Sequence, residues 1–251
     1  MTPETTPEDD YDAQSRVPDG AGLFIVTSRL NIDIYLNERN GEFPPAMFSS
    51  FTLLEAWCAS EGYIAESVGK VPPDEARLVR ASYDNFTYES IWVHTKSERY
   101  RRAMNAHFTK GFGERDENGK LTKVGKLKLL SALRRLHADH VINRARLASL
   151  PESWVMLMPV GGDSNSSYGS IVERKQPAYP AGTLSAKIDP LILVKIFAMA
   201  KVPRNLAQLE KLVSLVSGQM VESNFKADVL AQMRVNYLQM NSAAGNSILT
   251  Q

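Results

Sequence analysis

The sequence predicts an α+β protein, a mostly helical chain that carries a small ββα module and ends in C-terminal helices. Two observations predict this fold. Short apolar stretches at residues 136–142 and 154–160 have the length and pattern of strands, and apolar residues recur at helical spacing beyond residue 188. The 251 residues divide accordingly into an acidic tail, a mixed α/β region, a basic helical segment, the ββα module and a C-terminal helical region, at 1–22, 23–95, 96–135, 136–175 and 188–240.

The N-terminal half begins with a tail that is rich in acidic residues, Pro and Thr. It has no basic start and no apolar core, so it predicts a disordered segment rather than a secretory signal. Alternating apolar residues at positions 30, 32, 34 and 36 predict a strand. Residues 51–60 have the spacing of a helix. The run from Pro72 to Glu75 favours a helix start, because proline and acidic side chains suit a first turn.

Charge is distributed very unevenly along the chain. Residues 1–95 carry 6 Lys and Arg against 16 Asp and Glu, whereas residues 96–146 carry 14 against 5. A net charge of +1 for the whole chain hides this asymmetry. The basic block is suited to a polyanion such as nucleic acid. The alternative, equally open at this point, is that the basic and acidic blocks pair with each other within the fold.

Cysteine usage and hydropathy limit the cellular context. Cys58 is the single cysteine, so neither an internal disulfide nor a cysteine-based zinc site is expected. This composition is typical of a reducing cytoplasm. No apolar run approaches the roughly 18 residues of a membrane-spanning helix, so no membrane segment is expected.

The C-terminal third predicts three helices. Asp189 and Pro190 favour the first helix start, and Asn205 is a candidate cap for the second. Their stripe of Met and Leu side chains is typical of core packing, and the alternative is a docking face for a protein partner.

The residues that carry chemistry lie between positions 136 and 175. Asp139 and His140 end the first predicted strand, and Asn165 begins the helix that follows the second strand. The order Asp139-His140-Val141, apolar strand, then Asn165-Ser166-Ser167-Tyr168-Gly169 resembles the motif of the HNH, or ββα-metal, endonucleases. The resemblance covers about 40 of 251 residues.

The resemblance implies a reaction and a set of roles. His140 would act as general base, and Asp139 and Asn165 would hold one divalent cation, Mg²⁺ or Mn²⁺, through oxygen ligands. Glu173 is either a third ligand or a solvated side chain. DNA phosphates would be contacted by basic residues of the module and of the preceding segment: Arg99, Arg101, Arg102, Arg144, Arg146, Arg174 and Lys175.

Three features of the residues themselves qualify this assignment. Trp154 stands where the family often has an asparagine. Adjacent residues of a regular strand point in opposite directions, so Asp139 and His140 share one site only if the strand ends or distorts there. Asn165 is also a suitable helix N-cap.

The resemblance therefore implies a metal-dependent endonuclease that cleaves DNA and would suit a phage or antiviral defence context, and the cysteine usage favours the cytoplasm. Two alternatives remain open: a non-catalytic nucleic-acid-binding protein, and a helical subunit of a larger assembly.

Overall fold

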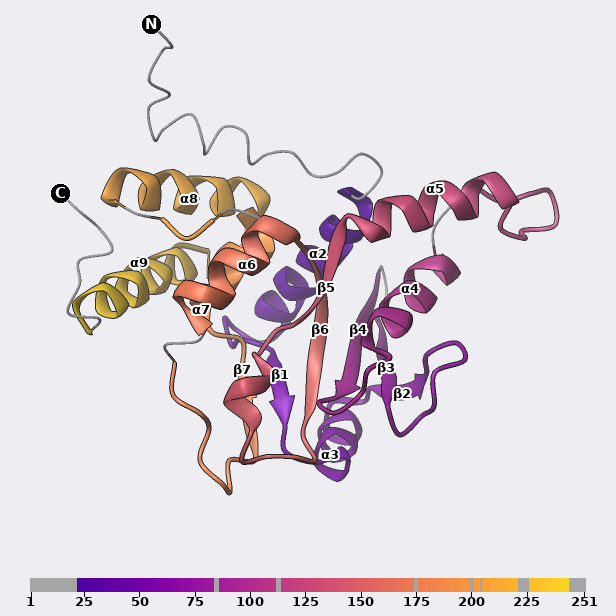
Figure 1. The fold of residues 1–251 in the computed structure, drawn as a ribbon, viewed down its shortest axis with the longest axis horizontal. Coiled ribbons are helices and arrows are strands. Elements are labelled where there is room, and N and C mark those ends of the chain that lie inside the picture. Colours follow the sequence, from indigo (N-terminus) through magenta and orange to yellow (C-terminus); the bar gives the residue numbers. More distant parts are fainter. Residues whose placement is uncertain are drawn as a thin grey trace, which may run out of the picture.

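The computed structural model of the chain (Figure 1) describes residues 22–83, 86–111, 114–173, 176–198, 201–203, 205–220 and 226–243. Its elements follow one another as α2 (Gly22–Glu38), β1 (Pro45–Phe48), α3 (Phe51–Glu61), β2 (Ile64–Ser67), β3 (Ala76–Tyr83), β4 (Phe86–His94), α4 (Tyr100–Gly111), α5 (Lys123–Arg134), β5 (Leu136–His140), β6 (Trp154–Gly161), α6 (Gly162–Ile171), β7 (Ser185–Lys187), α7 (Pro190–Leu193), α8 (Leu206–Gln219) and α9 (Lys226–Ala243). Between α7 and α8 the chain forms a π-helical segment, Val194–Ala198.

The described strands form one curled antiparallel sheet of seven strands around β6. One edge of β6 pairs with β4. The opposite edge is shared by two strands: β5 pairs along Leu157–Gly161 and β1 pairs at Trp154 and Val155. Because β5 and β1 meet at one edge of the same strand, the chain must leave the sheet where β5 ends.

Helices cover both faces of the sheet (Figure 1). On one face, α4 and α5 pack against the sheet through a cluster that includes Met104, Phe108, Leu133 and Ala138. On the other face, the larger cluster joins the sheet to α2, α3, α6 and the C-terminal helices. Burial of this apolar area is the main favourable term in folding.

The predicted fold class was wrong. The two strands of the expected ββα module, β5 and β6, do precede a helix, α6. They belong, however, to the seven-stranded sheet, where β6 also pairs with β4 and β1. The physical reason is that the free edges of a strand pair form hydrogen bonds with any other strand that reaches them. The hairpin of β3 and β4, which is distant in the sequence, supplies a long strand that pairs with β6.

Two local predictions in the N-terminal half also failed. The alternating residues at 30–36 lie in α2, not in a strand. Alternation was misleading there because Arg29, Asn31 and Asp33 are buried along with Ile32 and Leu36, and a helix that is packed on most sides has no clear apolar stripe. Pro72 to Glu75 form a turn before β3 rather than the start of a helix.

The C-terminal region follows its local sequence more closely. The Asn205 side chain accepts a hydrogen bond from the backbone N–H of Gln208 at 2.8 Å and caps α8. The apolar stripe of α8 and α9 is buried in the larger core cluster, including Leu209, Val213 and Met233. Among the described residues, no helix has both the length and the apolar composition that crossing a bilayer requires.

Candidate functional site

Asp139 and His140 are the last two residues of β5. Their strand pairs with β6 as far as His140 and Leu157, and Val141 still donates to the Met156 carbonyl at 3.0 Å. The two side chains lie on opposite faces of the sheet, as the alternation of a regular strand requires. Asp139 faces Lys195, whereas the His140 ring lies 4.9 Å from the Tyr100 ring of α4.

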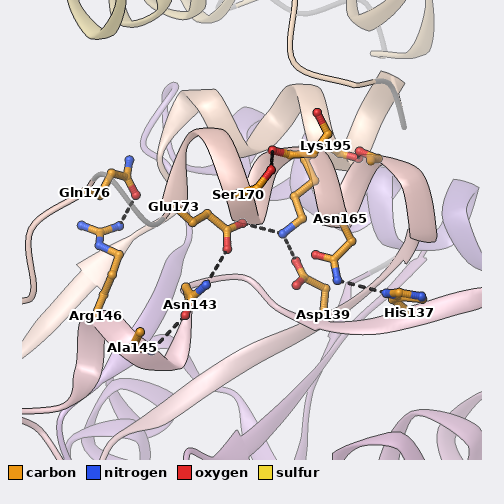
Figure 2. Close-up of polar contacts among 12 residues, drawn as sticks. His137, Asp139, Asn143, Ala145, Arg146, Asn165, Ser170, Glu173, Gln176 and Lys195 are labelled. Atoms are coloured by element: carbon orange, nitrogen blue, oxygen red, sulfur yellow. Dashed lines mark hydrogen bonds and ion pairs between the residues drawn. The ribbon is translucent and has the colours of Figure 1, made fainter. Parts of the chain in front are cut away.

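A buried cluster of charges surrounds Asp139 (Figure 2). The Lys195 ammonium lies 2.5 Å from Asp139 Oδ2 and 2.6 Å from Glu173 Oε1. The three side chains are 0 to 10% exposed. Asn143 Nδ2 donates to the second Glu173 oxygen at 3.1 Å. Asp139, Asn143, Glu173 and Lys195 form what is called here the lysine centre.

Backbone irregularities bring these four residues together. Lys195 belongs to the π-helical segment, and Arg29 donates to the neighbouring Ile196 carbonyl at 3.2 Å. Asn143 caps the 3₁₀ turn after β5 by accepting from the Ala145 N–H at 2.9 Å. The same amide thus fixes the turn with its oxygen and Glu173 with its nitrogen. π-Helical turns often occur at functional positions.

Burial and mutual attraction set the ionisation of the centre. Burial raises the pKa of Asp139 to about 6, the Lys195 charge opposes this rise, and the Glu173 charge adds to it. For Lys195, burial alone would lower the pKa, but the two carboxylates outweigh it and the pKa is raised. At neutral pH the centre therefore holds the Lys195 ammonium against an ionised Asp139 carboxylate.

His140 occupies a separate environment on the other face. Burial lowers its pKa to about 4, helped by the charges of Arg144 and Lys195, so the imidazole is neutral at pH 7. Its Nε2 is buried without a hydrogen-bond partner among the described residues. The Arg144 guanidinium lies 5.6 Å from the centre of the Tyr100 ring that His140 also contacts.

The expected metal ligands do not form a ready site for Mg²⁺ or Mn²⁺. The Lys195 ammonium already lies between the Asp139 and Glu173 carboxylates, where a divalent cation would have to bind. Asn165 lies 3.2 Å from His137, with its amide nitrogen against the ring Nδ1. Across the described ranges, no group of three or more His, Cys, Asp or Glu side chains is arranged to hold a metal ion. The donor set therefore does not fit the metal that the resemblance implies.

Three of the seven predicted phosphate contacts have other partners within the protein. Arg99 pairs with Glu75, and Arg101 donates to the Leu133 carbonyl at 3.1 Å and also to the Leu136 carbonyl. Arg146 donates to Gln176 at 2.6 Å and lies over the Tyr179 ring. Arg102 is exposed, and Arg174 and Lys175 lie outside the described residues.

Exposed basic side chains gather instead on α4, α5 and the loop between them. The members of this basic surface share two features: each is exposed, and none has an ion-pair partner among the described residues. They are Arg102, Lys110, Lys120, Lys123, Lys126, Lys128, Arg134 and Arg135. Lys110, Lys120 and Lys126 line a groove of about 620 Å³ between α4, α5 and the turn after β2.

The basic block predicted from the sequence contains Arg102, Lys110, Lys123, Lys126 and Lys128 of this surface. Of the lysine centre, Asp139 and Glu173 were predicted as site residues, whereas Asn143 and Lys195 were missed. Lys195 lies in an apolar run beyond the expected module, where a single lysine gives no local signal. The one available hint was that lysine is rarely buried without a charged partner.

Comparison with protein-family models, curated proteins and solved structures gives no match for this chain.

Proposed function

We propose that the protein binds nucleic acid through the basic surface of α4 and α5. The observation that carries this proposal is the set of eight exposed basic side chains that have no acidic partner among the described residues. Clustered cations of this kind attract a polyanion and release its counterions on binding.

The ion pairs of the basic block support this proposal over internal charge pairing. Within residues 96–146, Lys96 pairs with Glu152 and Arg99 with Glu75. Both pairs lie at the start of the block, outside the basic surface. The acidic N-terminal residues that the structure describes therefore leave α5 available to an external anion.

A charge-reversal experiment tests the proposal. Lys110→Glu/Lys126→Glu is compared with Lys187→Glu/Arg234→Glu, which changes the net charge equally. The control residues form surface ion pairs with Glu42 and Glu210, on elements away from α5 (Figure 1). Binding is measured by fluorescence anisotropy with a labelled duplex over a range of salt concentrations.

Loss of two phosphate contacts should weaken binding and reduce the slope of log K against log salt by about 2. The control pair should leave the slope unchanged. Equal slopes for wild type and the Lys110→Glu/Lys126→Glu protein would contradict the proposal.

A second candidate function is hydrolysis of the bound nucleic acid, with His140 as general base, as the resemblance of residues 139–169 to the HNH motif implies. His140 is a neutral imidazole, but its Nε2 is buried and burial lowers its pKa to about 4. It can therefore accept a proton from water only if nucleic-acid binding opens its environment to solvent. DNA is proposed as the substrate on the resemblance alone. No step is assigned to a metal, because the donor set does not fit one.

Plasmid nicking tests this second candidate, with Mg²⁺, Mn²⁺ and EDTA as separate arms. His140→Ala should lower the rate by about 10²–10⁴, while His94→Ala, which removes a histidine paired with Glu152, should leave it unchanged. Nicking by His140→Ala at the wild-type rate would remove His140 as the base, whereas absence of nicking by wild type would remove the hydrolase proposal and leave the binding proposal intact.

A further inference from the structure

Helix α5 presents one complete face to solvent. Its buried stripe is formed by Gly125, Leu129, Ala132 and Leu133, of which the last three pack on the sheet side. The opposite stripe is exposed and follows helical spacing: Val124, Leu127, Lys128, Ser131, Arg134 and Arg135. In Figure 1 the helix extends beyond the sheet, on the side away from α8 and α9.

The chain preceding α5 holds this helix firmly. Gly125 packs so closely on Glu114 that a Cβ there would lie 2.6 Å from the Glu114 carbonyl oxygen. The Thr122 side chain caps the helix by accepting a hydrogen bond from the Gly125 N–H at 2.9 Å. The backbone N–H of Thr122 donates to the Glu114 carbonyl, also at 2.9 Å. At the other end, Arg101 ties α4 to the last turn of α5. A presented helix that is anchored at both ends is preorganised for binding.

The composition of the outer face distinguishes it from a general phosphate-binding patch. Leu127 is 62% exposed and Val124 is 56% exposed, and both lie among basic residues. Phosphate binding alone has no use for exposed aliphatic side chains. The major groove of B-form DNA admits an α-helix and offers thymine methyl groups, base-edge acceptors and flanking phosphates.

We propose that α5 enters the major groove of B-form duplex DNA. Leu127 and Ser131 then face the base edges, and Lys128 and Arg134 contact phosphates at the groove walls. Lys110 and Lys126, in the groove beside α4, extend the phosphate contacts along the backbone. This inference rests on the proposed nucleic-acid binding and adds the substrate class.

The shapes of nucleic acids predict that α5 binds B-form duplex DNA more tightly than double-stranded RNA or a single strand. A-form RNA has a deep and narrow major groove that side chains cannot read, and a single strand has no groove. An anionic membrane is the competing partner, because a face of lysines and aliphatic residues also suits a lipid surface. Duplex DNA is favoured because the apolar part of the face is limited to Val124 and Leu127.

Two measurements test the inference, each with its own control. Ser131→Tyr adds bulk at the centre of the outer face without changing charge, and Ser214→Tyr adds the same bulk at an exposed position of α8. Separately, the wild-type chain is titrated with a plain duplex and with the same duplex carrying glucosylated 5-hydroxymethylcytosine, which fills the major groove. Double-stranded RNA, single-stranded DNA and vesicles of anionic phospholipid serve as further probes.

Ser131→Tyr and the glucosylated duplex should each weaken binding at least about tenfold, the size of one good base contact, while Ser214→Tyr binds as wild type does. Undiminished binding in either case overturns the major-groove inference but leaves phosphate binding in place. Stronger binding to vesicles than to duplex DNA overturns it in favour of a membrane surface. Failure to bind any nucleic acid overturns the proposed function itself.

Discussion

Replacing Lys195 by methionine removes the only cation of the lysine centre while keeping most of the side-chain volume. Asp139 and Glu173 then remain buried, with their charges facing each other, at 10% and 5% side-chain exposure. Removing one partner of a buried ion pair costs about 3–5 kcal/mol of unfolding free energy, mostly because the remaining charge is left uncompensated. We expect a loss of that size for Lys195→Met at pH 8.

The loss should depend on pH in a definite direction. Without the ammonium, the carboxylates relieve their repulsion by taking up a proton, and the pKa of Asp139 is already raised by burial to about 6 in the wild-type chain. Protonation at pH 5 removes one buried charge. The variant should therefore lose less stability at pH 5 than at pH 8.

Equilibrium unfolding in urea at the two pH values measures both effects. The matched control is Lys195→Met/Asp139→Asn/Glu173→Gln, which removes all three charges and should recover part of the stability, since uncharged replacements of a buried ion pair are often tolerated. A loss below about 1 kcal/mol at pH 8, or an equal loss at both pH values, would refute the reasoning. If the single variant does not fold at pH 8, the triple variant must still fold.

Further predictions concern acid stability, helix anchoring, capping and metal binding. The pKa of His140 is lowered from 6.5 to about 4, so between these two pH values the folded state binds fewer protons than the unfolded state. About 3 kcal/mol of unfolding free energy is therefore lost as the pH falls through this range. His140→Gln should reduce this acid sensitivity in urea unfolding. The raised pKa of Asp139 has the opposite effect between about pH 6 and 4, because there the folded state binds more protons than the unfolded state and gains stability as the pH falls. Asp139→Asn should therefore make the protein more acid-labile than wild type. A pH profile of stability that these substitutions leave unchanged would contradict both predictions. Arg101→Ala should lower the melting temperature more than Arg102→Ala, because Arg101 donates to two backbone carbonyls and Arg102 is exposed. Asn205→Ala should cost about 1 kcal/mol as a lost N-cap, with exposed Asn37→Ala as the comparison in the same melting assay. Titration with Mn²⁺, followed by calorimetry, should show no binding to wild-type chain at neutral pH, and stoichiometric uptake that Asp139→Asn abolishes would restore the metal assignment.

Local features that depend on neighbours in the sequence were accessible without a structure. Helix α3, the capped start of α8 and the strands at 136–140 and 154–161 follow from residue patterns, because hydrogen bonds and caps within a helix involve residues three or four apart. The uneven charge along the chain is likewise a property of the sequence. The prediction that Asp139 and His140 share one site only if their strand ends or distorts also came from local geometry, because consecutive residues of a strand point to opposite faces of the sheet.

Tertiary structure alone decided the partners of those residues. Asp139 was identified from its neighbour His140, yet its partner is Lys195, 56 residues later, which arrives through a π-helical turn that has no sequence signature here. Tertiary structure also decided the strand order of the sheet, where β6 pairs with β1 across more than 100 residues. Pairing over such distances depends on how all the elements pack together, and no local pattern in the sequence encodes it.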